Sequence, residues 1–244
     1  MEWSDSAIVL SSRPHGENGV IMELLTREHG RHMGLVHGGT SRRTRSTLQP
    51  GNTLDVHWRG RLAEHLGSYT AELATARAGS LMEGRDSLKG LNAFTAICGA
   101  ALPERQSYPP VFVVGEILLD AMMASAPSHW LPLYARWEAG LLEALGFGLD
   151  LGECAATGST DELIYVSPRS GRAVSKAGAG IYASRLFKLP AFLNGDAASD
   201  PMPAETLEAL RMTGHFLLER VLEPNGAAMP QARIRLDSLI AESR

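Results

Sequence analysis

The fold of this chain is constrained most by a change in hydrophobic period near residue 78. Before that point, short segments alternate apolar and polar residues, which is the period of a β-strand. After it, apolar residues recur every three or four positions, which is the period of an α-helix. The sequence therefore predicts an α+β protein, with a strand-rich domain over residues 1–78 and a mainly α-helical domain over residues 79–244.

Five alternating segments predict five strands in the first domain. They are Ser6–Arg13, Gly19–Thr26, Gly30–His37, Thr53–Arg61 and Leu66–Leu73. Both faces of the second segment carry apolar residues, as expected of a strand in a small closed barrel. Five short strands within about 75 residues favour an OB-like barrel. Two roles are open for Trp58 on the fourth strand, which are packing in the barrel core and stacking on nucleic-acid bases.

Helical periodicity predicts five helices in the second domain, at Asp86–Ala101, Pro110–Ala126, His129–Leu145, Ala204–Leu222 and Arg233–Glu242. We interpret the aromatic stripe of the third helix, formed by Trp130, Tyr134 and Trp137, as core. Residues 151–180 are rich in Gly and Ser and contain one strand-like run, Leu163–Val166. They predict a small β-hairpin inserted into the helical domain.

Composition and termini favour a cytoplasmic protein without a membrane segment. Hydrophobic residues make up 44% of the chain, which is enough for a buried core. No apolar run approaches the ~18 residues of a membrane span, and the N-terminus lacks the basic start and apolar stretch of a secretory signal. Cys98 and Cys154 are far apart in the sequence, and no disulfide is expected in a reducing compartment.

Positive charge gathers between Gly30 and Arg61, although the whole chain has a net charge of −4. This stretch carries a single acid, Asp55, against six arginines, which are Arg31, Arg42, Arg43, Arg45, Arg59 and Arg61. The middle three are predicted to lie in an exposed Gly/Ser/Thr-rich loop between two strands. An anionic partner is expected, either nucleic-acid phosphate or an acidic protein, and the alternative is a loop that only aids solubility. Arg59 and Arg61 at a strand end are second candidates, and Arg31 is interpreted as a surface residue.

Motifs of several enzyme classes are absent. No phosphate-binding loop, dinucleotide fingerprint or nucleophile elbow occurs, so an ATPase, a Rossmann enzyme or a serine hydrolase is not expected. His29, His32 and His37 do not share one face of a strand, and we interpret them as solvated or phosphate-facing rather than as metal ligands. A metal-dependent hydrolase built on these histidines is the remaining catalytic alternative. We expect a binding protein that uses no cofactor.

The order of several short sequences resembles the RecO recombination-mediator family over nearly the whole chain. In order they are Gly16–Thr26 with Gly30, Gly38-Gly39, Arg42–Ser46, Leu48–Pro50, Gly60-Arg61, Phe147–Cys154, Ile164–Pro168 and Ser170-Gly171. This resemblance implies an N-terminal OB-fold followed by a helical domain with an embedded zinc-knuckle region. Zinc-binding members have paired Cys-x-x-Cys elements there, whereas this chain has Thr157 after Cys154 and no cysteine in residues 175–178. A degenerate knuckle without metal is therefore expected.

The resemblance also implies a non-enzymatic function. Members of the family bind single- and double-stranded DNA, anneal complementary strands, and work with RecR to load RecA onto strands coated by single-strand-binding protein. They recognise the acidic C-terminal tail of that protein through the helical domain, where Arg136, Arg185 and Lys188 are our candidate contacts. For DNA, the candidates are Arg42, Arg43 and Arg45, followed by Arg59 and Arg61.

An alternative function is a protein-interaction adaptor that binds acidic partner tails through its helical domain without contacting DNA. The motivating observation is the charge of residues 79–244, which carry 14 basic against 19 acidic side chains. Such a domain is poorly suited to direct contact with phosphates.

Overall fold

The computed structural model describes residues 1–195 and 201–242, except for the side chains of Arg43 and residues 240–242. The chain forms two compact units, one of residues Met1–Ala124 with Pro230–Leu236 and one of Ser125–Met229 with Asp237–Arg244. The mixed α+β class is confirmed, with five strands at the N-terminus and helices after them. The expected domain division at residue 78 lies inside the first unit and stays a prediction.

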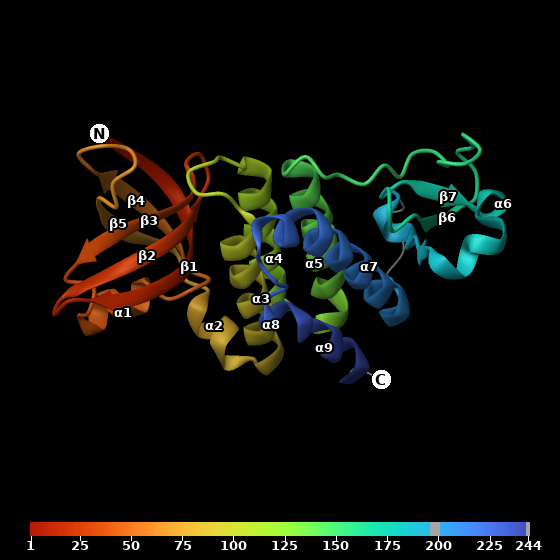
Figure 1. Cartoon of the computed structure of the whole chain (residues 1–244). Coiled ribbons are helices and arrows are strands. Elements are labelled where there is room, and N and C mark those ends of the chain that lie inside the picture. The colour runs from red at the N-terminus through yellow and green to blue at the C-terminus, as the bar shows by residue number, and fades with distance from the viewer. Residues whose placement is uncertain (196–200, 243–244) are drawn as a thin grey trace. The chain divides into compact units, whose positions relative to one another are not determined.

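Five strands close into a barrel in the first unit, in the spatial order β1-β2-β3-β5-β4 (Figure 1). They are β1 (Glu2–His15), β2 (Gly19–Thr26), β3 (Gly30–His37), β4 (Thr53–Arg59) and β5 (Ser68–Thr75). β3 and β5 pair in parallel, and the other neighbours are antiparallel. This arrangement fits an OB-fold.

β2 and β3 have the bounds predicted from the sequence, but β1 is longer than predicted. Its first half pairs with β4 and its second half pairs with β2, and the register shifts between Val9 and Ser11. One strand therefore belongs to both sides of the barrel. Residues Glu2–Asp5 contain no aliphatic side chain, so their alternation of apolar and polar residues is weak. The sequence alone therefore did not reveal that β1 begins at Glu2.

Alternate side chains of the strands fill the barrel interior. Val20, Met22 and Leu24 of β2 lie in this core together with Trp58, which is 1% exposed. The indole nitrogen of Trp58 donates a hydrogen bond to the carbonyl oxygen of Leu66, at 3.0 Å. The core interpretation of Trp58 is confirmed, and its role as a base-stacking surface is excluded by its burial. Burying a large apolar side chain stabilises the fold by about 1.5–3 kcal/mol.

The basic segment between β3 and β4 is a short helix, α1 (Arg42–Thr47), so its prediction as a loop was wrong. Ser41 caps this helix, because its hydroxyl accepts a hydrogen bond from the backbone nitrogen of Thr44 at 3.2 Å. Leu48 follows at the other end and packs into the barrel core. The cap and the buried leucine together outweigh the loop preference of the Gly/Ser/Thr-rich sequence.

Four further helices belong wholly to the first unit, which are α2 (Ala78–Glu83), α3 (Arg85–Ala101), α4 (Pro109–Ala124) and α8 (Gln231–Ile234). The predictions for α3 and α4 are confirmed to within two residues. α2 was not predicted, because only Ala78 and Leu81 are buried along its six residues and such a short segment has almost no period.

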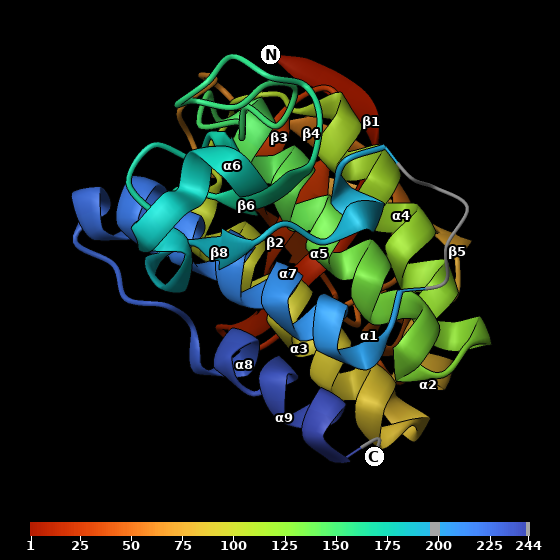
Figure 2. The same ribbon diagram turned by 90° about the vertical axis from the view of Figure 1, so that its right-hand side faces the viewer.

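Two long helices, α5 (Pro127–Ala144) and α7 (Pro203–Phe216), lie side by side in the second unit (Figures 1 and 2). Trp130, Tyr134 and Trp137 of α5 are buried, which confirms the aromatic stripe as core. The helix predicted to end at Leu222 changes at Phe216 into a π-helical turn, η3 (Leu217–Leu222), followed by η4 (Glu223–Asn225). The predicted last helix is two helices, α8 and α9 (Leu236–Glu242).

The predicted hairpin is present in the second unit. β6 (Leu163–Val166) and β7 (Ala173–Ser175) form it, and β8 (Phe187–Lys188) adds a third strand beside β6. Three short helical turns accompany this sheet, which are α6 (Lys176–Ala179), η1 (Gly180–Arg185) and η2 (Ala191–Leu193). Among the described helices, none is both long enough and apolar enough to cross a membrane.

Candidate nucleic-acid and partner interfaces

Helix α1 presents two arginines at the barrel surface. Arg42 and Arg45 are exposed and three residues apart, so they lie on neighbouring positions of one helix face. Neither forms an ion pair with another described residue. The backbone of Arg43 belongs to the same helix, but its side chain lies outside the described residues. A guanidinium group presents a planar fork of N–H donors that matches the geometry of a phosphate group. The helix backbone fixes the positions of the Cα atoms from which the two arginine side chains extend.

Arg59 and Arg61 lie at the opposite end of β4 from α1. Arg59 is the last residue of the strand, and Arg61 follows in the turn toward β5, with both side chains exposed. The N-terminal amino group of Met1 donates a hydrogen bond to the carbonyl oxygen of Gly60 between them, at 2.8 Å. Seven residues of extended strand span about 20 Å. The predicted DNA-contact arginines therefore form two separate groups on the barrel.

Arg31 is held by other side chains and does not offer a free charge. Its guanidinium forms an ion pair with Glu23, and its Nε donates to the carbonyl oxygen of Leu102 at 2.8 Å. The side chain is 16% exposed. Arg31 is therefore a partly buried residue with a paired charge, and it joins β3 to the chain that follows α3.

The three histidines have three different environments. His32 is buried, and its Nδ1 lies 2.8 Å from the hydroxyl oxygen of Tyr69. Burial and the nearby charge of Arg105 lower the pKa of His32 to about 4, so it is neutral near pH 7. The solvated or phosphate-facing interpretation is wrong for His32, while His37 is exposed and His29 partly so. Within the described part of the chain, no group of three or more His, Cys, Asp or Glu side chains is placed to hold a metal ion.

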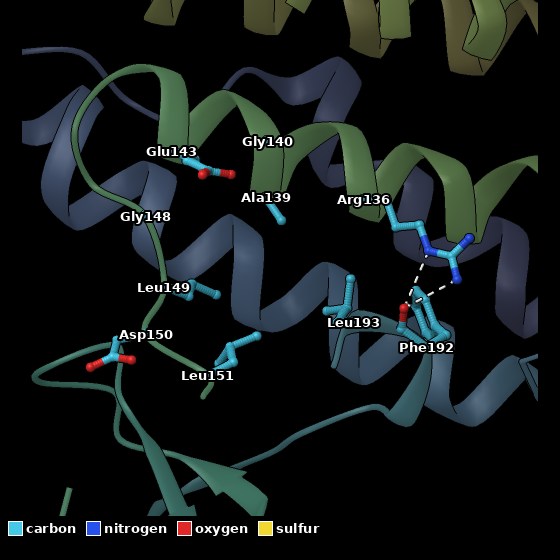
Figure 3. Close-up of a pocket in the computed structure, with 10 residues that line it drawn as sticks. All are labelled: Arg136, Ala139, Gly140, Glu143, Gly148, Leu149, Asp150, Leu151, Phe192 and Leu193. Carbon is cyan, nitrogen blue, oxygen red and sulfur yellow. Dashed lines mark hydrogen bonds between the residues drawn. The ribbon is translucent and has the colours of Figure 1, made fainter. Parts of the chain in front are cut away.

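A pocket of about 720 Å³ lies along α5 in the second unit (Figure 3). One wall is a face of α5 on which Ala139 and Gly140 leave the helix surface low. The facing wall contributes apolar side chains from two segments, namely Leu149 and Leu151 from one and Phe192 and Leu193 from the other. The volume of this pocket lies in the usual range of ligand pockets. Its apolar walls can bury an apolar side chain of a partner.

Charges of opposite sign mark the two ends of this pocket. At one end, Arg136 donates from Nε and Nη2 to the carbonyl oxygen of Phe192, at 3.3 and 3.1 Å, and its guanidinium carbon lies 5.4 Å from the centre of that ring. At the other end are the carboxylates of Glu143 and Asp150 (Figure 3). Asp150 accepts a hydrogen bond from Nε of Arg172 at 2.9 Å. The pocket therefore favours a ligand whose negative group faces Arg136.

Arg185 and Lys188 do not line this pocket. Arg185 is the last residue of η1, and Lys188 lies in β8 opposite Tyr165 of β6. Both side chains are exposed. Of the three predicted partner contacts, only Arg136 lies at the pocket. Nothing in the sequence marks Leu149, Leu151 and Phe192 as a group, because a pocket wall built from separate segments has no common period.

Comparison with known proteins assigns both parts of the chain to one family. A family model described as the recombination protein O N terminal matches residues 1–77. A second, described as the recombination protein O C terminal, matches residues 83–227. The chain belongs to the RecO family. The resemblance inferred from short sequences is thereby confirmed.

Curated relatives in the RecO family are similar over nearly their full length. The chain is 48% identical over 237 residues to the DNA repair protein RecO of Rhodospirillum centenum, covering 96% of this chain and 93% of the relative. It is 47% identical over 241 residues to the DNA repair protein RecO of Ruegeria sp., covering 98% of both chains. With the protein of the same name from Cereibacter sphaeroides strain KD131, identity is 47% over the full length of both.

In this RecO-family chain, the positions with knuckle spacing come together beside the three-stranded sheet. The backbone nitrogen of Ser175 donates to the sulfur of Cys154 at 3.2 Å, and the Ser175 hydroxyl accepts from the backbone nitrogen of Gly178 at 3.1 Å. The Thr157 hydroxyl lies 3.5 Å from that of Ser175. A tetrahedral zinc site needs four nitrogen, sulfur or carboxylate ligands. A single thiolate at these four positions does not fit zinc.

Hydrogen bonds favour the charged form of the Cys154 thiol. Burial by itself would raise its pKa, but hydrogen bonds from the side chain and backbone of Ser175, the hydroxyl of Thr157 and the backbone of Ala156 outweigh burial and lower the pKa to about 6. Cys154 also packs with Val174 in the small core of this region. Hydrogen bonds to its sulfur and apolar packing thus hold Cys154 in this region.

Proposed function

We propose that this chain is a DNA-binding recombination mediator in DNA repair. It binds single- and double-stranded DNA, anneals complementary strands, and together with RecR helps load RecA onto strands coated by single-strand-binding protein. The observation that carries the proposal is the pair Arg42 and Arg45 on a capped helix of a barrel that fits an OB-fold, in a chain whose relatives are named DNA repair protein RecO. We propose a cytoplasmic protein that acts by binding and not by catalysis.

The proposed physical route is neutralisation of phosphates. Arginines of α1 displace condensed counterions from one strand, which favours binding entropically at low salt. Neutralisation also weakens the repulsion between two strands, so complementary bases meet more often. Arg59 and Arg61, at the other end of β4, supply a second basic group for a longer strand or for a second strand. Double-stranded DNA offers the same phosphates and binds by the same contacts.

We further propose that the pocket along α5 receives the acidic C-terminal tail of single-strand-binding protein. The apolar walls would bury a hydrophobic side chain of the tail, and Arg136 would pair with a carboxylate. Because Glu143 places a negative charge at the opposite end, where Asp150 is paired with Arg172, the acidic part of the tail should leave the pocket at the Arg136 end. Arg185 and Lys188 remain candidates for contacts outside the pocket.

The sheet of β6, β7 and β8 with the cluster around Cys154 is, in this proposal, a degenerate zinc knuckle. Its spacing, Cys154-x-x-Thr157 and Ser175-x-x-Gly178, matches that of paired zinc ligands, but only Cys154 among these four residues supplies a thiolate. The proposed division of labour assigns DNA contact to residues 1–78 and partner contact to residues 79–244.

The test of DNA contact is a change of the α1 arginines. Substituting Arg42, Arg43 and Arg45 with Ala should weaken binding of a fluorescent single-stranded oligonucleotide in anisotropy titrations. The slope of log affinity against log salt should flatten by about 0.7 for each phosphate that the variant no longer neutralises. Arg211→Ala, an exposed arginine of α7, is the control and should change neither quantity. Unchanged affinity and slope in the triple variant would show that α1 is not the DNA site.

The function itself is tested by strand annealing. Complementary strands should anneal faster with the protein, both bare and coated with single-strand-binding protein. Failure under both conditions would overturn the proposed function. The second candidate, an adaptor that binds only protein tails, is favoured by the charged pocket of the second unit. It predicts capture of the acidic tail with no measurable oligonucleotide binding by the full chain.

A further inference from the structure

Beside helix α1, the surface of the first unit holds a second cavity, of about 300 Å³. Four consecutive segments of the barrel line it, which are the end of β1, the start of β2, the turn after β3, and α1 with the residues after it. Arg45 is part of its lining. The cavity is therefore adjacent to the side chain for which we propose phosphate contact.

The walls of this cavity are aliphatic and its edge is polar. Val20 and Leu48 are buried in the barrel core and form the apolar part together with Pro14. Ser12 and Thr40 contribute hydroxyl groups, and neither has a hydrogen-bond partner within the part of the chain that the structure describes. A flat, apolar group with polar atoms on its rim matches this distribution.

Two contacts hold the cavity in shape. Gln49 donates from Nε2 to the carbonyl oxygen of Arg45 at 3.0 Å, so its amide is fixed at the end of α1. Gly39 approaches the wall so closely that an added Cβ would lie 2.8 Å from Cγ2 of Val20 and 3.2 Å from Cδ1 of Leu48. Any larger residue at position 39 would displace the turn. The cavity is consequently formed before a ligand arrives, which lowers the entropic cost of binding.

We propose that this cavity receives one unstacked nucleobase of a bound single strand, while Arg42 and Arg45 contact the phosphates next to it. This inference rests on the proposed function and adds base contact to phosphate contact. Charge favours nucleic acid over other occupants, because Arg45 lines the cavity and Arg42 lies one helical turn away. Hydroxyl and amide groups both donate and accept hydrogen bonds, so every base type is accepted. The base held in this way anchors the strand without selecting sequence.

The experiment compares two strands of equal charge, oligo-dT and an abasic strand of the same length, with the full chain in anisotropy titrations. Wild type should bind oligo-dT about tenfold more tightly than the abasic strand. The double variant Ser12→Leu/Thr40→Leu fills the cavity with aliphatic carbon while all arginines remain. It should bind both strands with the affinity that wild type has for the abasic strand. Thr70→Leu, an exposed position on β5, should retain the tenfold difference.

The outcomes separate the two proposals. If wild type binds neither strand, the proposed function fails and the base site fails with it. If wild type binds both strands equally, DNA contact stands but the cavity takes no base, which leaves an aliphatic side chain of a partner protein as its occupant. If the filled variant keeps the tenfold difference, the base is bound elsewhere and the inference is overturned. Circular dichroism melts verify that the variant is folded.

Discussion

Arg77 illustrates how a single buried charge can join distant segments of one unit. The side chain is 4% exposed and lies between the start of β4 and helix α4. It forms an ion pair with Asp120, lies 3.5 Å from Glu116, and donates to the hydroxyl of Thr53 at 2.6 Å. Its backbone nitrogen donates to the side-chain oxygen of Asn52 at 2.9 Å. No local pattern marks Arg77 in the sequence, because its partners are contributed by other elements.

Substituting Arg77 with Met keeps most of its volume but removes these hydrogen bonds. We expect the free energy of unfolding to fall by about 2–3 kcal/mol, since charged hydrogen bonds are removed and Glu116 keeps an uncompensated charge. The Asp120 side chain is about half exposed, so solvent screens its ion pair with Arg77 and the loss of this pair costs little. Denaturant titration measures the change. Arg85→Met, at an exposed position of α3, should cost less than about 0.5 kcal/mol, and equal destabilisation by both variants would contradict the role of Arg77.

Cys154 provides a second prediction at the residue scale, in its response to pH. Its folded pKa of about 6 is lower than the ordinary value of 9.0, so the folded state favours the thiolate. Stability from this group should rise as pH increases from 6 to 9, and should be lost as pH falls through 6. Thiolate ultraviolet absorbance should show a step near pH 6 in wild type. The step should vanish in Cys154→Ser and persist in Cys98→Ser, because burial raises the pKa of Cys98.

At the scale of elements, α1 is too short to be stable by itself. Its six residues are held by the Ser41 cap at one end and by Leu48 in the barrel core at the other. Both anchors lie outside the helical residues. A segment that looks like a flexible loop in the sequence thus becomes a rigid support for Arg42 and Arg45.

Removing the cap with Ser41→Ala should loosen α1 by about 1 kcal/mol without changing the charge of the chain. We expect faster hydrogen exchange at the amides of Thr44–Thr47 and a modest decrease in oligonucleotide affinity, with the salt slope retained. Ser80→Ala, at an exposed position of α2, is the matched control. Unchanged exchange at α1 would mean that the packing of Leu48 alone maintains the helix.

At the scale of the whole molecule, the two proposed interfaces lie in different units. Arg42 and Arg45 belong to the first unit and Arg136 to the second. The two activities should therefore be separable by substitution. This separation also decides between a DNA-binding mediator and an adaptor that binds protein alone.

Arg136→Ala should weaken binding of a fluorescent peptide with the acidic tail about tenfold or more, because a charged hydrogen bond is removed. Its affinity for single-stranded DNA should stay unchanged. The variant with Ala at Arg42 and Arg45 should show the opposite behaviour. Anisotropy with the labelled peptide and with a labelled oligonucleotide measures both, and the disappearance of both activities in either variant would contradict separate interfaces.

Local periodicity in the sequence determined much of this fold. β2, β3 and β6 have the predicted bounds, and every end of α3, α4 and α5 lies within two residues of its predicted position. Side chains at strand or helix spacing report directly which face is buried. The clustering of arginines around α1 was also visible, since it needs only the order of residues. Family membership was predicted from the order of the short sequences between Gly16 and Gly171.

Tertiary structure alone decided what depends on contacts between distant residues. It turned the basic loop into a helix, because Leu48 finds a place in the barrel core. It buried His32, which is therefore neither solvated nor phosphate-facing, and it paired Arg31 with Glu23. It also formed the pocket at Arg136 and the cavity at Arg45 from segments that share no pattern. The spacing of apolar residues along the chain determines secondary structure. A binding site depends instead on which side chains, distant in the sequence, are brought together by packing.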